Sequence, residues 1–267
     1  MKKDSKYKIA VGILILIIIV LGFFLVSKPK KAAVRVPAVV KGRIAIIIDD
    51  LGYNLNNLRV LEQIRRPLTC SVLPNLEYSR RAAEELHARG YHVILHLPME
   101  PQEKYGLEKN TILTSMDEET IRSILRQDLS SIVYAEGVSN HMGSRATEDP
   151  ATMEAIFKEL KKRRLYFLDS YVSSKSVCSQ LAAKISLGFA KRDVFLDNKS
   201  EPAYIKQQIY KLKSRAGFYG YAIGIGHDRK ATLEVLKEMI PELEKEGYRM
   251  VFVSDVIKQG APKRLKR

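Results

Sequence analysis

The chain has 267 residues and a formal net charge of +15, and this length allows one α/β domain with a full core. The excess charge lies at the ends: residues 1–43 hold ten Lys/Arg against one acid, and residues 258–267 hold five Lys/Arg and no acid. These ends contribute +9 and +5, which leaves +1 for residues 44–257. A nearly neutral body argues against a nucleic-acid partner, and basic ends suit an anionic lipid surface better.

An apolar segment lies near the amino terminus. Ile9 to Val26 is an unbroken run of apolar residues and glycine whose 18 residues reach the threshold for a membrane-spanning helix. Lysines flank it on both sides, and no small-residue cleavage pattern follows. We therefore expect residues 1–27 to be an uncleaved signal anchor, residues 28–43 a basic linker, and the rest an extracytoplasmic domain of a single-pass membrane protein. A cleaved secretory signal is the alternative.

From Ile44 onward, strand-like segments alternate with helical patterns. Alternation of this kind favours a parallel sheet with helical connections. We expect residues 44–257 to form one (β/α) barrel, with an open doubly wound sheet as the alternative, and residues 258–267 to form a basic tail. The candidate strands begin near Ile44, Leu68, Tyr91, Gly137, Leu165, Asp193, Tyr219 and Arg249.

Several local patterns predict where helices begin and bend. Ser115-Met-Asp-Glu118 fits a capping box before a helix over 117–133. Asp149-Pro150 predicts a helix with proline in its first turn. Pro241 predicts a kink or break in a last long helix over 229–246.

Five of the predicted strands end in polar side chains. Because the carboxyl ends of parallel strands meet at one rim, we expect these side chains to form a single site. The five segments are Ile44–Asp50, His92–His96, Gly137–His141, Tyr166–Asp169 and Tyr221–His227.

The first two of these segments carry the residues best suited to acid, base and metal chemistry. Asp49 and Asp50 are adjacent at a strand end and point to different sides, so one can hold a cation while the other accepts a proton. A turn-capping role is the alternative, because Asp before Gly is common in turns. Alternation puts His96 at the rim with His92 lower on the same face. Glu100, four residues on, can return to the same site.

The later segments add further polar residues. His141 lies among polar neighbours that include Asn140 and Ser144, and a loop histidine bonded to backbone is the alternative. Asp169 and Asp197 end the next two strands, where either can be a helix cap instead.

His227 follows Gly224-Ile-Gly226, whose missing side chains would let substrate or backbone approach closely. A mixed Asp/His set of this kind suits a divalent transition metal, with Zn²⁺ as the first expectation and Co²⁺, Mn²⁺ or Ni²⁺ as alternatives.

In order and spacing, these motifs resemble a known family, the divergent polysaccharide deacetylases, which are relatives of the carbohydrate esterase family 4 enzymes. The resemblance covers roughly residues 42–258. It implies an irregular seven-stranded (β/α) barrel that hydrolyses the amide of N-acetylated sugars. The motifs that carry it are Ile48-Asp49-Asp50-Leu51-Gly52, His96-Leu-Pro-Met-Glu100, Asn140-His141-Met-Gly-Ser144 and Gly226-His227.

The resemblance also implies roles for single residues. Asp49 would be the base, Asp50 a metal ligand and His227 the general acid. The family's second motif has two histidines four residues apart, whereas here only His96 matches and Glu100 stands at the second position.

The family's Arg-and-Pro-Tyr loop is replaced by residues 140–145, and from its chemistry alone we expect His141 to supply the missing nitrogen ligand. A further set is expected on the substrate side, namely Glu100, Asn140, Ser144, Asp169 and Asp197.

Two functions of different class follow from these patterns. The first is a metal-dependent hydrolase that deacetylates an envelope polysaccharide. The second is a non-catalytic envelope module that binds a glycan or a protein on the same barrel, and the departures at Glu100 and at 140–145 favour it. A phosphate-ester hydrolase is a third and weaker interpretation, because Arg145 and Arg229 are the only nearby phosphate-binding candidates. The sequence predicts a carbohydrate polymer as the partner and gives no indication of a particular protein partner.

Overall fold

The computed structural model describes residues 7, 11–18, 20–21, 40–103 and 106–258. Among these, no helix combines the length and the apolar character needed to cross a bilayer. The predicted anchor (residues 1–27), linker (28–43) and basic tail (258–267) lie largely outside the described residues.

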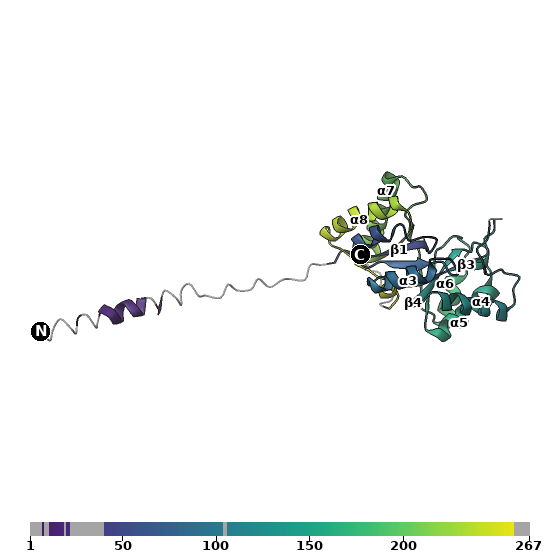
Figure 1. Cartoon of the computed structure of the whole chain (residues 1–267), viewed down its shortest axis with the longest axis horizontal. Coiled ribbons are helices and arrows are strands. Elements are labelled where there is room, and N and C mark those ends of the chain that lie inside the picture. Colours follow the sequence, from purple (N-terminus) through teal and green to yellow (C-terminus); the bar gives the residue numbers. More distant parts are fainter. Residues whose placement is uncertain (1–6, 8–10, 19, 22–39, 104–105, 259–267) are drawn as a thin grey trace. The chain divides into compact units, whose positions relative to one another are not determined.

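The domain that begins near Val40 alternates strands and helices along the described chain (Figure 1). Its strands are β1 (Gly42–Leu51), β2 (Thr69–Val72), β3 (His92–Met99), β4 (Ala135–Met142), β5 (Tyr166–Asp169), β6 (Phe189–Lys191), β7 (Val194–Phe195), β8 (Tyr221–His227) and β9 (Tyr248–Val251). Its α-helices are α2 (Leu58–Ile64), α3 (Ser79–Ala88), α4 (Glu118–Ser131), α5 (Pro150–Arg163), α6 (Cys178–Ile185), α7 (Pro202–Tyr219), α8 (Lys230–Lys245) and α9 (Val253–Lys258).

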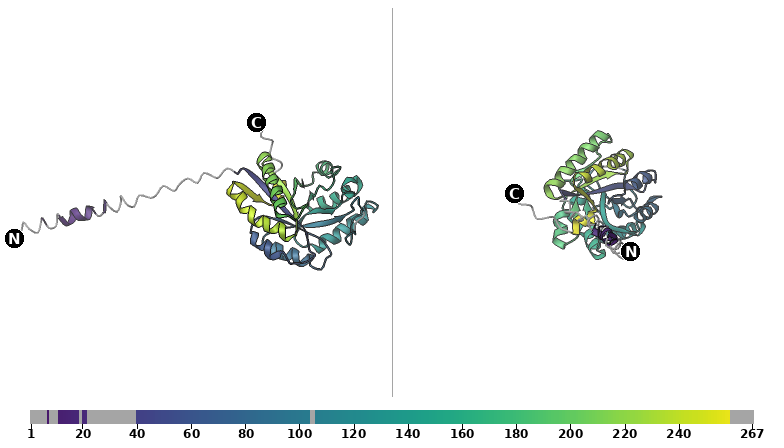
Figure 2. Two further views of the ribbon diagram at one scale, coloured as in Figure 1. Left: turned by 90° about the horizontal axis from the view of Figure 1, so that it is seen from above. Right: turned by 90° about the vertical axis from the view of Figure 1, so that its left-hand side faces the viewer.

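The strands form one parallel sheet, which confirms the predicted α/β class. Its order is β6-β5-β4-β3-β2-β1-β8-β7, and β9 pairs with the first half of β1. Helices cover the outer side of the curved sheet (Figure 2). The edge strands β6 and β7 are separated only by Arg192 and Asp193, a connection that spans at most about 11 Å. The two edges therefore lie close together, and the sheet curls into an incomplete barrel.

The expectation of seven strands was wrong, because the described part of the sheet has nine. The eight candidate starts all correspond to strands, and β6 is the one they omit. With only three residues, β6 is too short to show the alternation that identifies a strand from its sequence.

Alternation along each strand divides the core into two clusters. Side chains on the outer face of the sheet, such as Ile46 and Ile48, pack against the helices. The inner face forms a smaller cluster that includes Ile47, Ile94 and Ile225, and Val253 of α9 joins it. The backbone N–H of Val253 donates to Thr69 at the start of β2, so α9 closes the mouth of the barrel at the amino ends of the strands.

Helix starts agree with the sequence in one case and differ in another. Asp149 caps α5 through its carboxylate, which accepts from the Thr152 N–H at 2.7 Å, and Pro150 is in the first turn. The capping box predicted at Ser115 is absent: Asp117 caps α4 by accepting from Thr120 N–H at 2.7 Å. An aspartate nearer the helix satisfies the same free N–H groups. Pro241 does not end α8, which continues to Lys245.

Candidate functional site

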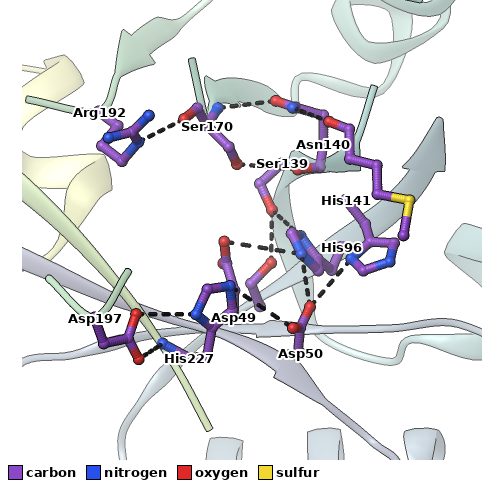
Figure 3. Close-up of polar contacts among 12 residues, drawn as sticks. Asp49, Asp50, His96, Ser139, Asn140, His141, Ser170, Arg192, Asp197 and His227 are labelled. Carbon is purple, nitrogen blue, oxygen red and sulfur yellow. Dashed lines mark hydrogen bonds and ion pairs between the residues drawn. The ribbon is translucent and has the colours of Figure 1, made fainter. Parts of the chain in front are cut away.

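The polar residues predicted at the strand ends meet at the carboxyl-end rim of the barrel (Figure 3). Asp49 and Asp50 come from β1, His96 from β3, His141 from β4 and His227 from β8. Asp49 and His227 are paired positions in the sheet. Asp49 and His96 lie two residues beyond Ile47 and Ile94 of the inner cluster, so the polar layer sits directly above the apolar interior.

Asp50 faces this site because its backbone leaves the regular strand conformation. Its φ of 64° lies in the left-handed region, and the pairing of β1 with β2 is irregular between Ile48 and Leu51. In a regular strand, Asp50 would point away from Asp49. Aspartate tolerates the left-handed region better than most residues. Both carboxylates consequently reach the same site.

The carboxylate of Asp50 lies between two imidazoles. Its Oδ1 is 3.3 Å from Nε2 of His96 and 3.1 Å from Nδ1 of His141. One ligand atom from each of the three residues lies within 4.8 Å of the others. Two imidazoles and one carboxylate form a donor set that Zn²⁺ accepts, and three protein ligands leave further positions open. The residues present therefore fit a divalent transition metal.

The electrostatic interactions among these groups favour a positive charge between them. Burial alone would raise the pKa of the Asp50 carboxyl, but hydrogen bonds to His141 and His96 outweigh it and hold the pKa well below its ordinary value. Burial alone would lower the pKa of His96, but Asp49 and Asp50 outweigh it and raise that pKa. A proton or a cation is favoured at the same place, so the two compete for it.

Asp49 is a buried carboxyl of the rim, at 3 % exposure. Its Oδ2 lies 3.8 Å from Nε2 of His96, and its Oδ1 is buried without a hydrogen-bond partner among the described residues. Burial is the largest influence on its pKa and raises it. A carboxylate with a raised pKa is a better proton acceptor than a solvated one.

His227, the sheet partner of Asp49, is held by the buried carboxylate of Asp197. Nδ1 of His227 lies 2.9 Å from Oδ1 of Asp197. The other oxygen of Asp197 accepts from the His227 backbone N–H at 2.9 Å and from the Thr232 hydroxyl at 2.6 Å. Burial lowers the pKa of His227, but Asp197 outweighs it and raises the pKa. When Nδ1–H of His227 donates to Asp197, Nε2 faces Oδ2 of Asp50 at 3.8 Å. In the protonated ring, Nε2 can then donate a proton into the site.

Two residues predicted on the substrate side bind the protein's own loops instead. Glu100 accepts from the backbone N–H and the hydroxyl of Thr114 at 2.6 and 2.7 Å, and its other oxygen pairs with Arg145 at 3.1 Å. Ser144 accepts from the Gln102 N–H at 2.8 Å. These contacts hold together the segments that follow β3 and β4.

Asn140 and Asp169 also bind backbone. Asn140 accepts from the Ser170 N–H at 2.8 Å and donates to the Met142 carbonyl at 2.7 Å. The carboxylate of Asp169 accepts from the Tyr171 N–H and from the Ser176 hydroxyl, both at 2.7 Å. The structure thus places both residues where they shape the rim, beneath its surface.

The glycines before His227 have a different role from the one expected. A Cβ at Gly224 would lie 2.7 Å from Cδ2 of Leu212, and one at Gly226 would lie 2.8 Å from Cγ2 of Thr232. The missing side chains therefore admit residues of α7 and α8 on the outer face of the sheet, and the expected approach of substrate at these positions was wrong.

Sequence reasoning missed three neighbours of the site. Ser71 and Ser139 are buried and hydrogen-bonded to each other, and Ser139 lies 2.8 Å from Nδ1 of His96; in the sequence, neither serine stands in a motif that marks it. Arg192 donates from Nε and Nη2 to the carbonyls of Ser170 and Tyr171 at 2.6 and 2.8 Å. It follows β6, the strand that the sequence did not reveal.

Comparison with known proteins finds relatives that match most of this chain. A relative in Escherichia coli K12, the uncharacterised protein YibQ, is 35% identical over 205 residues, which are 77% of this chain and 64% of YibQ. The match thus spans less than two thirds of that relative.

Two solved structures have a similar fold. An uncharacterised protein from Agrobacterium tumefaciens C58 is similar with a TM-score of 0.75 and 24% identity, over 80% of this chain and 88% of that one. A pseudoenzyme of the CE4 family from Bacillus anthracis is similar with a TM-score of 0.53 and 14% identity, over 81% and 66% of the two chains.

The model of one family, described as divergent polysaccharide deacetylase, matches residues 46–257. This range contains every strand end that contributes to the rim. The chain belongs to the divergent polysaccharide deacetylase family.

Proposed function

We propose that this protein is a metal-dependent hydrolase that removes acyl groups from N-acetylated sugars of an envelope polysaccharide. The observation that carries the proposal is the convergence of Asp50, His96 and His141 within 4.8 Å, with the Asp49 carboxylate 3.8 Å from His96 and Nε2 of His227 3.8 Å from Asp50. Metal-assisted amide hydrolysis uses a bound Lewis acid, a base for water and an acid for the leaving amine, and this rim offers residues for each role.

In this proposal the three clustered residues hold the metal, most simply Zn²⁺, which would polarise the acyl carbonyl when bound. Asp49 accepts a proton from the attacking water as the new carbon–oxygen bond forms. His227 donates a proton from Nε2 to the sugar nitrogen as the carbon–nitrogen bond breaks. The products are a carboxylate and a free amino sugar. Asp197 keeps His227 in the orientation that this donation needs.

The test combines metal content with turnover in the purified full-length chain. We expect about one equivalent of transition metal in the wild type, and loss of it in His141→Ala. His87→Ala, which changes a histidine stacked on Tyr134 of the outer surface, is the matched control and keeps the metal.

Asp49→Asn and His227→Ala keep the metal and lose acetate release from N-acetylated glycans. Full metal content in His141→Ala would overturn the ligand assignment.

A second candidate is a non-catalytic module that binds glycan on the same barrel. The observation in its favour is at Glu100, which replaces the second histidine of the family motif. Its carboxylate binds Thr114 and Arg145 of the protein itself. A protein that binds metal and acetylated glycan but releases no acetate would support this candidate over the hydrolase.

We also propose that the apolar segment Ile9–Val26 anchors the domain to the membrane on its extracytoplasmic side. The support is the 18-residue apolar run with flanking lysines, which is long enough to span a bilayer. The protein should remain in the membrane fraction after alkaline carbonate extraction and should be digested by protease added to spheroplasts. Recovery in the soluble fraction would contradict the anchor.

A further inference from the structure

We propose that a groove beside the candidate site binds a carboxylate-bearing sugar, so that the preferred polymer is an acidic N-acetylated glycan. This seam groove lies between α7 and the segment Arg192–Phe195, and its volume is about 710 Å³. A volume in this range is typical of small-molecule sites. The inference rests on the proposed function, because it concerns the same polymer, and it applies equally to the glycan-binding alternative.

The seam groove adjoins the candidate site through Phe195. The centroid of the Phe195 ring lies 5.1 Å from that of the His227 ring. Phe195 and Asn198 both line the groove, and between them in the chain stands Asp197, whose carboxylate holds His227. A glycan whose reacting sugar is bound at His227 can therefore place a neighbouring sugar in the groove.

The lining of the seam groove has an excess of positive charge. It contains Arg192, Lys211 and Arg215, and its one acid is Asp193. The Asp193 carboxylate is already engaged, because Oδ1 accepts from Arg215 at 3.0 Å and Oδ2 accepts from the Ile223 N–H at 2.9 Å. Arg192 and Lys211 form no ion pair among the residues that the structure describes. The charge of the groove thus favours an anionic ligand.

Arg192 and Lys211 also have hydrogen-bond donors that the protein leaves open. Arg192 uses Nε and Nη2 for two carbonyls, whereas its Nη1 has no hydrogen-bond partner in the described part of the chain and is not fully buried. Lys211 is exposed, and its Nζ donates to the side chain of Gln208 at 3.3 Å. Guanidinium and ammonium groups bind carboxylates through charge-assisted hydrogen bonds, which are shorter and stronger than neutral ones.

The uncharged residues of the groove suit a sugar better than a simple anion. Asn198 and Gln207 are exposed, and their side-chain amides make no hydrogen bond to any described residue, so they can bind sugar hydroxyls. Tyr210 is 48 % exposed and offers a ring on which the apolar face of a sugar can pack. The groove therefore combines groups for a carboxylate with groups for the sugar that carries it.

A simpler interpretation is that the groove is a solvated junction between α7 and the seam. Its cations would then serve solubility, as exposed lysines often do. Any attraction of an acidic glycan would come from the whole surface, and every cation of α7 would contribute alike. In the seam groove, by contrast, only the cations that line it contribute.

The experiment compares two tetrasaccharides by titration calorimetry with the full-length chain. One is the neutral tetramer of N-acetylglucosamine. The other alternates N-acetylglucosamine with N-acetylmuramic acid, which keeps the β-1,4 backbone and adds a lactyl carboxylate to every second ring. We expect the acidic tetrasaccharide to bind about tenfold more tightly, as one charge-assisted hydrogen bond would give. This preference should shrink as the salt concentration rises, because the groove is open to solvent.

Variants of two exposed residues locate the preference. Lys211→Gln and Arg215→Gln should each reduce it by about threefold to tenfold, and Lys211→Glu should abolish it. Lys206→Gln is the matched control, because Lys206 is also on α7 but pairs with Glu238 at 2.7 Å and does not line the groove. It should keep the preference of the wild type. The affinity for the neutral tetrasaccharide should be the same in all four variants.

Three results would overturn the inference: equal affinity for the two tetrasaccharides, a preference that survives in Lys211→Glu, or an equal loss in Lys206→Gln. Absence of binding to both would do the same. Acetate release is measured in parallel and tests the proposed function separately. Preferential binding without acetate release would contradict the hydrolase and leave the groove assignment in place, whereas release from both glycans at equal affinity would do the reverse.

Discussion

Asp128 on α4 is a fully buried carboxyl that lies outside the candidate site. Its Oδ1 accepts from the side-chain amide of Asn75 at 2.6 Å and from that of Asn110 at 3.4 Å. Its Oδ2 is buried without a partner among the described residues. Burial is the largest influence and raises the pKa of Asp128 to about 6. The folded protein therefore favours the protonated form more than the unfolded chain does.

The consequence is a stability contribution that depends on pH. The contribution is fully present below the unfolded pKa of about 3.9 and is lost as pH rises through about 6. Asp128→Asn removes this titration. Relative to the variant, the wild type should lose on the order of 2–3 kcal/mol of unfolding free energy between pH 4 and pH 8. Denaturant unfolding at both pH values measures this difference. Glu154→Gln on the exposed face of α5 is the control, and parallel pH curves for wild type and Asp128→Asn would contradict the prediction.

At the scale of elements, the packing of α8 on β8 depends on Gly226. A Cβ there would lie 2.8 Å from Cγ2 of Thr232, the residue whose hydroxyl holds Asp197 at 2.6 Å. Gly226→Ala must push α8 away from the sheet, and we expect a loss of about 1–3 kcal/mol, as for other overpacked core positions. Urea unfolding is the measurement. Gly106→Ala is the control, because a Cβ at Gly106 meets no atom within 4 Å. Equal stability of the two variants would mean that α8 can shift without cost.

At the scale of the whole molecule, Arg192 joins the two edges of the incomplete barrel. It lies between β6 and β7, donates to two carbonyls in the segment after β5, and lies over the ring of Phe195 at 4.6 Å. Hydrogen bonds from a charged donor contribute about 1.5–3 kcal/mol, and the planar fork of arginine is what reaches both carbonyls. Arg192 thus links the segment after β5 to the short connection between β6 and β7, at the seam of the incomplete barrel.

Arg192→Lys should therefore lower the unfolding free energy by about 1.5–3 kcal/mol and speed amide exchange in β6 and β7. Hydrogen exchange followed by mass spectrometry resolves these strands. Arg126→Lys is the matched control, since Arg126 makes an exposed ion pair with Glu119, and such pairs contribute little. Unchanged exchange at the seam in Arg192→Lys would show that the edges are held by other contacts.

The sequence by itself determined the class of fold and the composition of the rim. Apolar runs that end in Asp49, His96 and His227 carry both the strand period and the chemical groups, and parallel strands connected by helices can only bring such ends to one side. Local patterns also determined the start of α5 at Asp149-Pro150. They failed at β6, whose three residues are too few to show a period.

Only the tertiary structure decided which polar side chains face the site and which bind the protein itself. Glu100 and Asp169 have the same chemistry as Asp49, but their carboxylates are taken by backbone and hydroxyl groups of neighbouring loops. Ser71 and Ser139 meet across β2, β3 and β4, a contact set by strand register. The physical reason is that a side chain's type and its alternation are local properties, whereas its partner depends on the packing of segments distant in the chain.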